Sequence, residues 1–147
     1  MELNELYSQI IKDHNLSRHN KHELAEPSVV VPGHNPSCGD EIQLFLQFKD
    51  GIIADASYTG VGCAISQASV SIMLDMVKGK TFEEAKSLCG LFLNMIRRTP
   101  LTEEEEQELE EAIAFANISN MPARVKCATM PWHTLEAALE AASPAEN

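Results

Sequence analysis

Apolar residues near the start of the chain follow the period of an α-helix. Five of them, Leu3, Leu6, Tyr7, Ile10 and Ile11, fall at positions i, i+3, i+4, i+7 and i+8. This spacing puts them on one face of a helix, so it predicts an amphipathic helix over residues 3–12. The polar stretch over residues 13–28 lacks such a period and is predicted to be a loop.

The pattern then changes to that of β-strands. Three consecutive valines over residues 29–31 favour a short strand, and proline, glycine and asparagine over residues 32–39 favour a turn-rich loop. Apolar and polar side chains alternate over residues 42–49, as in a half-buried strand. Asp50-Gly51 is a strong signal for a two-residue hairpin turn, which leads to a return strand over residues 52–58. These features predict a small antiparallel sheet.

The second half of the chain is helical in pattern. A helix is predicted from Ala64 to Lys78, ending at Gly79, and a second one over residues 82–98. Thr81 and the glutamate three residues later fit a capping box at the start of this second helix.

Two further helices complete the predicted fold. Thr102 and Glu105 fit another capping box, which opens a helix that continues to Ala116. Pro122 separates this helix from a final one over residues 127–142. The order of helix, sheet and helices predicts an α+β fold, a small antiparallel sheet with helices packed on it. At 147 residues, the chain is expected to form one domain over residues 1–147.

Charge and composition exclude several classes of protein. The chain carries 11 basic and 22 acidic residues, a net charge of −11, and 44% of its residues are apolar. It has no basic stripe that could displace counterions from phosphates, so we expect neither nucleic acid nor an anionic membrane as a partner. Its apolar runs are too short to span a bilayer, and its N-terminus is acidic where a signal peptide is basic. We therefore expect a cytoplasmic protein.

Three of the four cysteines lie in segments that suit chemistry more than core packing. These segments are Asn35–Asp40, Gly60–Ser66 and Arg124–Thr129. Cys63 and Cys127 are predicted at helix N-termini, where free N–H groups and the helix dipole favour a thiolate. The fourth cysteine, Cys89, lies inside a predicted helix and is expected to be a small buried apolar residue.

Three thiolates and one carboxylate form a donor set that suits zinc. The candidate ligands are Cys38, Asp40, Cys63 and Cys127. Arg124 and Lys126 could offset part of the negative charge that these four ligands carry. The spacing of the cysteines is wide and contains no CxxC pair, so from chemistry alone a shared metal site and separate structural cysteines both stay open.

The three cysteine motifs, taken in this order, resemble those of the SufU family within the IscU/NifU-like iron–sulfur assembly proteins. The resemblance begins at Leu6-Tyr7, ends near Leu135 and so covers nearly the whole chain. IscU-type proteins carry a histidine where this chain has Lys126, and they carry a Leu-Pro-Pro-Val-Lys segment that is absent here. The resemblance is therefore closer to the SufU branch.

The resemblance implies a zinc-dependent sulfurtransferase with one SufU/NifU N-terminal-like domain. Such proteins take persulfide sulfur from a pyridoxal-phosphate cysteine desulfurase of the SufS type and pass it toward cluster assembly, to a downstream SufBCD-type scaffold. By motif position the zinc ligands would be Cys38, Asp40, Cys63 and Cys127. Arg124 matches an arginine beside the family's metal site, where it would give electrostatic support. We expect Cys38 to accept the sulfur, because its loop is rich in glycine and proline.

Two other functions remain open at this point. Three cysteines can hold an iron–sulfur cluster with Asp40 as a labile fourth ligand, which would make the protein an assembly scaffold. Alternatively, zinc could only stabilise an interaction module that carries out no transfer. Hydrolysis by zinc is disfavoured, because no Glu or His is placed to act as a general base.

Overall fold

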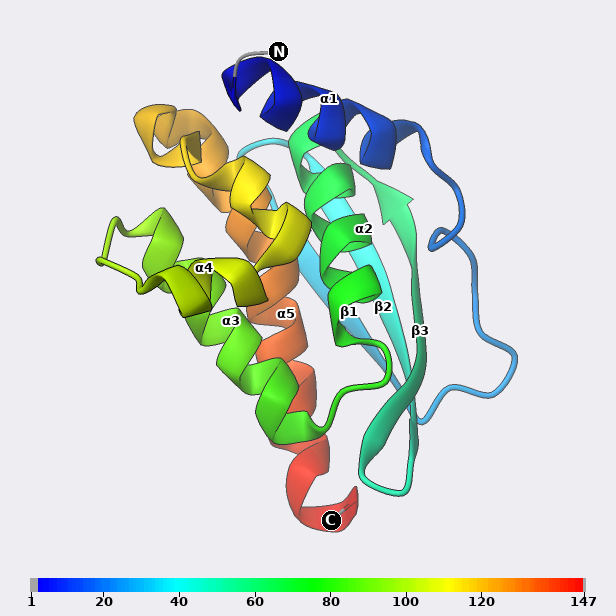
Figure 1. The fold of residues 1–147 in the computed structure, drawn as a ribbon. Helices are drawn as coiled ribbons and strands as arrows, with labels where there is room; N and C mark the ends of the chain where they lie inside the picture. The colour runs from blue at the N-terminus through cyan, green and yellow to red at the C-terminus, as the bar shows by residue number, and fades with distance from the viewer. Residues whose placement is uncertain (1–2, 147) are drawn as a thin grey trace.

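The computed structural model describes residues 3–146, and these form a three-stranded antiparallel sheet with helices packed on it (Figure 1). The strands are ordered β1-β2-β3 and comprise Val29–Asn35, Asp40–Lys49 and Ile52–Val61. The α-helices are α1 (Leu3–Leu16), α2 (Ala64–Val77), α3 (Phe82–Ile96), α4 (Glu103–Glu108) and α5 (Pro122–Glu146). Two 3₁₀ helices, η1 (Glu110–Phe115) and η2 (Ile118–Asn120), join α4 to α5. The predicted α+β class is confirmed.

The helix α1 is four residues longer than the apolar period predicts. His14 is buried, and its ring nitrogens lie 2.9 Å from Ser71 Oγ of α2 and 3.0 Å from Glu111 Oε1 of η1. These contacts hold the last turn of α1 against the other helices. The prediction of a loop is therefore wrong for residues 13–16.

The hairpin between β2 and β3 forms as predicted. Asp50 and Gly51 both have positive φ, 54° and 77°, as a type I′ turn requires. Along β2 the residues Ile42, Leu44 and Leu46 are almost completely buried under the helices. The alternation in the sequence thus gave the correct inner face of this strand.

The first strand is longer than predicted. It continues through Pro32 and Gly33 and ends at Asn35. β1 is an edge strand, where the missing N–H of a proline is tolerated. A Cβ built on Gly33 would lie only 2.4 Å from Thr134 Oγ1 of α5, so glycine allows the strand to approach this helix closely. The predicted loop over 32–39 shrinks to a tight turn over residues 36–39, and this turn carries Cys38.

The helix predicted to continue to Ala116 breaks after Glu108. Glu110 has a φ of 46°, and the chain continues as the 3₁₀ helix η1. Leu109, Ala112 and Phe115 are all buried at a spacing of three residues. Because a 3₁₀ helix has three residues per turn, it places these side chains on one face. The capping boxes at Thr81 and Thr102 are both present.

The last helix begins at Pro122, five residues earlier than predicted. Proline suits the first helical position, where its missing N–H costs nothing and its φ is already helical. Cys127 consequently lies in the second turn of α5, and its prediction at a helix N-terminus is wrong. Cys63 does lie at a helix start, as the N-cap residue of α2.

An aromatic residue of α5 packs against α3 and α2. The Trp132 ring of α5 stacks on Phe92 of α3 with centroids 4.3 Å apart, and its indole N–H donates to Ser69 Oγ of α2. None of the helices described is both long and apolar enough to cross a membrane.

Candidate metal centre

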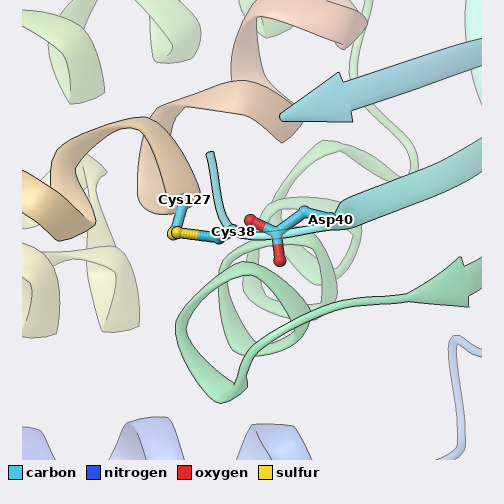
Figure 2. Close-up of side chains that lie close together, drawn as sticks. All are labelled: Cys38, Asp40 and Cys127. Carbon is cyan, nitrogen blue, oxygen red and sulfur yellow. The ribbon is translucent and has the colours of Figure 1, made fainter. Parts of the chain in front are cut away.

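Three of the four predicted ligands meet where the β1–β2 turn faces α5. The sulfurs of Cys38 and Cys127 and a carboxylate oxygen of Asp40 all lie within 4.8 Å of one another. The two sulfurs are 2.9 Å apart. Figure 2 shows these side chains pointing toward a common region from the turn, from the start of β2 and from α5. Residues far apart in the sequence are thus brought together by the fold.

Asp40 is completely buried, and the hydrogen bonds around it stabilise the carboxylate form. One oxygen accepts hydrogen bonds from the Cys63 backbone N–H at 2.9 Å and from the Ser66 hydroxyl at 3.1 Å. The other accepts from the Asn35 amide at 3.0 Å. Burial alone would raise the pKa of Asp40, but these bonds and one from Cys127 outweigh it, so the pKa is lowered.

Cys63 lies beside this cluster without being part of it. Its backbone holds Asp40, while its half-buried sulfur lies 3.9 Å from Ser66 Oγ. The Cys63 thiol also interacts with Cys127 and contributes to the raised pKa of that residue. The structure therefore places Cys63 next to the other three residues, and its role as the fourth ligand stays a prediction.

Cys127 is completely buried on α5. Burial, followed by hydrogen bonds with Cys38 and Cys63, raises the pKa of its thiol. The raised pKa favours the neutral thiol in the protein without a bound cation. A bound cation reverses this preference, because a coordinating thiol is deprotonated.

Arg124 faces the sulfurs from the first turn of α5. A hydrogen bond to Cys127 comes first among the causes that raise the pKa of its guanidinium, followed by the charges of Cys63 and Cys38. The side chain is exposed, so it can also contact a group that approaches from outside. Lys126, which was expected to help balance the charge, is exposed and lines a cavity with Asn35, Ser37 and His133.

The residues present fit a divalent cation. Asp40 is a buried carboxylate, and no salt bridge joins it to any cationic side chain among residues 3–146. A buried carboxylate without a positive partner is costly, and a metal ion would supply the missing charge. Sulfur donors together with one oxygen donor match zinc.

Sequence reasoning assigned no role to two residues that hold the site. Asn35 donates to Asp40 and lies 3.5 Å from the Cys127 sulfur, while Ser66 bridges Asp40 and the Cys63 carbonyl. Both lie inside the cysteine motifs, which is the signal that could have found them. Cys89 is fully buried in α3, and burial raises the pKa of its thiol, as its predicted core position implies.

Fold and site together define a small α+β protein with a cluster of two cysteines and one aspartate that could hold a metal ion. The NifU-like N-terminal domain family matches residues 6–141 of the chain, so the protein belongs to this family.

Two relatives are similar over most of their length. The chain is 40% identical to the "Iron-sulfur cluster assembly scaffold protein IscU" of Thermotoga maritima, covering 92% of this chain and 93% of the relative. It is also 40% identical to the "Zinc-dependent sulfurtransferase SufU" of Bacillus subtilis, covering 91% and 89%. Identity alone therefore does not separate the two named functions.

One solved structure gives the same family, and a second gives the same fold. An iron–sulfur cluster assembly scaffold protein for the SUF system from Fervidobacterium islandicum superimposes with a TM-score of 0.85 at 36% identity, covering 94% of this chain and 99% of that one. A NifU-like N-terminal protein from Brucella abortus reaches 0.83 at 22% identity, which supports the fold alone.

Proposed function

We propose that this protein is a zinc-dependent sulfurtransferase. It accepts persulfide sulfur from a pyridoxal-phosphate cysteine desulfurase of the SufS type and passes it on for iron–sulfur cluster assembly. The observation that carries the proposal is the convergence of Cys38 and Cys127 on the buried carboxylate of Asp40, with Cys63 adjacent. The relative in Bacillus subtilis is named for this activity.

Zinc would be held by Cys38, Asp40, Cys63 and Cys127. When bound, the metal keeps the sulfurs as thiolates and lowers their reactivity until a partner docks. Asn35 and Ser66 hold the Asp40 carboxylate in place for this role. Ligands supported by such surrounding hydrogen bonds bind metal more tightly.

Cys38 is the sulfur acceptor in this proposal. It is only partly buried, and its neighbours in the turn, Ser37 and Gly39, are exposed, whereas Cys127 is enclosed. The Cys38 thiolate attacks the outer sulfur of the partner's persulfide. A new S–S bond forms on Cys38, the partner's S–S bond breaks, and its electron pair leaves on the partner's thiolate.

Arg124 supports this exchange electrostatically. Both the attacking and the departing sulfur carry negative charge, and the guanidinium already interacts with all three cysteines. Because it is exposed, it can remain in contact with Cys38 when the partner's sulfur approaches. Its charge lowers the cost of bringing two thiolates together.

The test is desulfurase turnover, measured as alanine release from cysteine, with zinc-loaded and metal-stripped protein. Zinc-loaded wild type is expected to stimulate turnover, and mass spectrometry should find one added sulfur on Cys38. Cys38→Ser should abolish both effects. Cys89→Ala, which removes a cysteine outside the site, is the matched control and should retain them. Stimulation retained by Cys38→Ser would reject Cys38 as the acceptor.

A scaffold that holds an iron–sulfur cluster is the second candidate. The relative in Thermotoga maritima is named as one, and three cysteines near a carboxylate can bind iron as well as zinc. Metal analysis of protein purified without oxygen separates the two functions. Zinc in equimolar amount supports the transferase, while iron with acid-labile sulfide supports the scaffold.

A further inference from the structure

The side-chain amide of Gln67 has hydrogen-bond partners for its oxygen and none for its nitrogen among the described residues. Gln67 lies in the first turn of α2 and is 4% exposed. Its Oε1 accepts a hydrogen bond from Lys21 Nζ at 3.0 Å and lies 3.4 Å from the Tyr58 hydroxyl. Over residues 3–146, its buried Nε2 finds no hydrogen-bond partner.

The orientation of this amide follows from its partners. An ammonium group can only donate hydrogen bonds, so the group that faces Lys21 must be the oxygen of Gln67. The Tyr58 hydroxyl can donate to the same oxygen. The NH₂ group therefore points the other way.

That other direction leads to the metal centre. A Cβ built on Gly62 would lie 3.1 Å from Gln67 Nε2 and 2.6 Å from Asp40 Oδ1. The free donor and the carboxylate thus flank the same glycine. Gln67 also lies one turn after Cys63 on α2, and its backbone N–H donates to the Cys63 carbonyl. A buried donor without an acceptor is costly, so the free Nε2 of Gln67 needs an explanation, and the nearby Asp40 carboxylate is a suitable acceptor.

We propose that Gln67 is a positioning residue that donates its free amide hydrogen to the Asp40 carboxylate in the loaded metal centre, and that Lys21 fixes the amide for this purpose. The inference rests on the metal site of the proposed function. Ligating carboxylates are generally hydrogen-bonded by surrounding groups, and loss of these groups weakens metal binding.

The loop over residues 17–28 thereby becomes part of the site. It runs beside β3, where the Tyr58 backbone N–H donates to the Asn20 carbonyl at 2.9 Å. Lys21 follows directly and lies over the Tyr58 ring, 5.8 Å from its centroid. Its ammonium polarises the amide of Gln67 and strengthens the donor at the other end.

The test measures zinc affinity by competition with a chromophoric chelator, and the visible spectrum of the Co²⁺-substituted protein. Gln67→Glu has the same shape but replaces the donor with an oxygen that faces Asp40, and Gln67→Met removes both polar ends. Each should weaken zinc binding by about ten- to a hundredfold and shift the Co²⁺ absorption bands. The melting temperature of the metal-free proteins checks that each variant is folded.

Lys21→Met should weaken zinc binding in the same direction by a smaller factor. Lys78→Met is the matched control, because Lys78 also donates a hydrogen bond to the loop, to Asn20 Oδ1 at 2.5 Å, whereas the side-chain oxygen of Gln67 is bonded by Lys21 and Tyr58. It removes the same charge and should leave affinity and spectrum unchanged.

Wild-type affinity and wild-type Co²⁺ bands in folded Gln67→Glu and Gln67→Met would overturn the inference. Equal losses in Lys21→Met and Lys78→Met would overturn the role of Lys21. If wild type binds zinc and Gln67 matters, but desulfurase turnover is not stimulated, the proposed function fails while this inference stands.

Discussion

An alanine at position 62 should damage the candidate metal centre, although Gly62 is not itself one of the proposed ligands. A Cβ on Gly62 would stand 2.5 Å from Ser66 Oγ and 2.6 Å from Asp40 Oδ1, closer than such atoms can approach. One or both oxygens must move. The hydrogen bonds at risk are those that Asp40 Oδ1 accepts from the Cys63 N–H and the Ser66 hydroxyl.

The size of the effect follows from these two bonds. Each is a bond to a charged acceptor and contributes about 1.5–3 kcal/mol, so complete loss of both sets an upper limit of about 3–6 kcal/mol. Alanine in place of glycine returns about 0.4–1 kcal/mol by restricting the unfolded chain. Since small movements of the chain will preserve part of the bonding, we expect Gly62→Ala to lower the free energy of unfolding by about 2–4 kcal/mol.

The assay is urea denaturation of the metal-free protein, with Gly90→Ala as the matched control. Gly90 lies inside α3, and apart from its chain neighbours and the backbone of its own helix no atom of the described residues stands within 4 Å of the position its Cβ would take. The same substitution there should raise stability by about 0.5–1 kcal/mol, because glycine disfavours a helix. Gly62→Ala should also bind zinc more weakly. Equal stability of Gly62→Ala and wild type would refute the crowding at Asp40.

Two further predictions concern charge at the site. Arg124→Ala should reduce stimulation of the desulfurase while leaving the melting temperature unchanged, because the side chain is exposed and acts on the sulfurs. Arg124→Lys, which keeps the positive charge, should retain part of the stimulation. Desulfurase turnover with Arg124→Ala equal to that with wild type would contradict this role. The lowered pKa of Asp40 means that its carboxylate stabilises the metal-free fold above the unfolded pKa of about 3.9, and that this contribution is lost as the pH falls through the lower folded value. Stability measured between pH 6 and pH 2 should therefore fall more steeply for wild type than for Asp40→Asn, and parallel curves would show that Asp40 is not stabilised in this way.

Local signals in the sequence predicted the elements whose stability is local. The Asp50-Gly51 turn and the capping boxes at Thr81 and Thr102 depend on residues within a few positions, and all three form as predicted. The errors lie where distant contacts decide the structure. β1 continues through Pro32 because the strand is at an edge and lies on α5.

The helix errors have the same origin. The chain departs from the α-helix at Glu110 because a 3₁₀ helix buries Leu109, Ala112 and Phe115 together. The last turn of α1 exists because His14 finds partners on α2 and η1. Neither contact can be read from the local pattern.

The candidate metal centre depends both on local sequence motifs and on contacts between residues far apart in the chain. The motifs named the candidate ligands, but their meeting depends on the register of the sheet, which the Asp50-Gly51 turn alone does not fix. Residues Asn35 and Asp40 pair across the β1–β2 turn, and Glu41 pairs with Val61. This register puts the start of β2 beside Gly62 and Cys63 as they leave β3.

A bulge sets that register. Near the hairpin, Phe48 pairs with Ile53, but the next pair is Gln47 with Asp55, so Ala54 is an extra residue in β3. Without it, every pair beyond would shift by one position, about 3.4 Å along the strand, and the chain leaving β3 would present its opposite face to Asp40. The Cys63 N–H could then not reach the carboxylate that it now holds at 2.9 Å. An irregularity about 24 Å away along the strand thus determines whether the Cys63 motif meets Asp40.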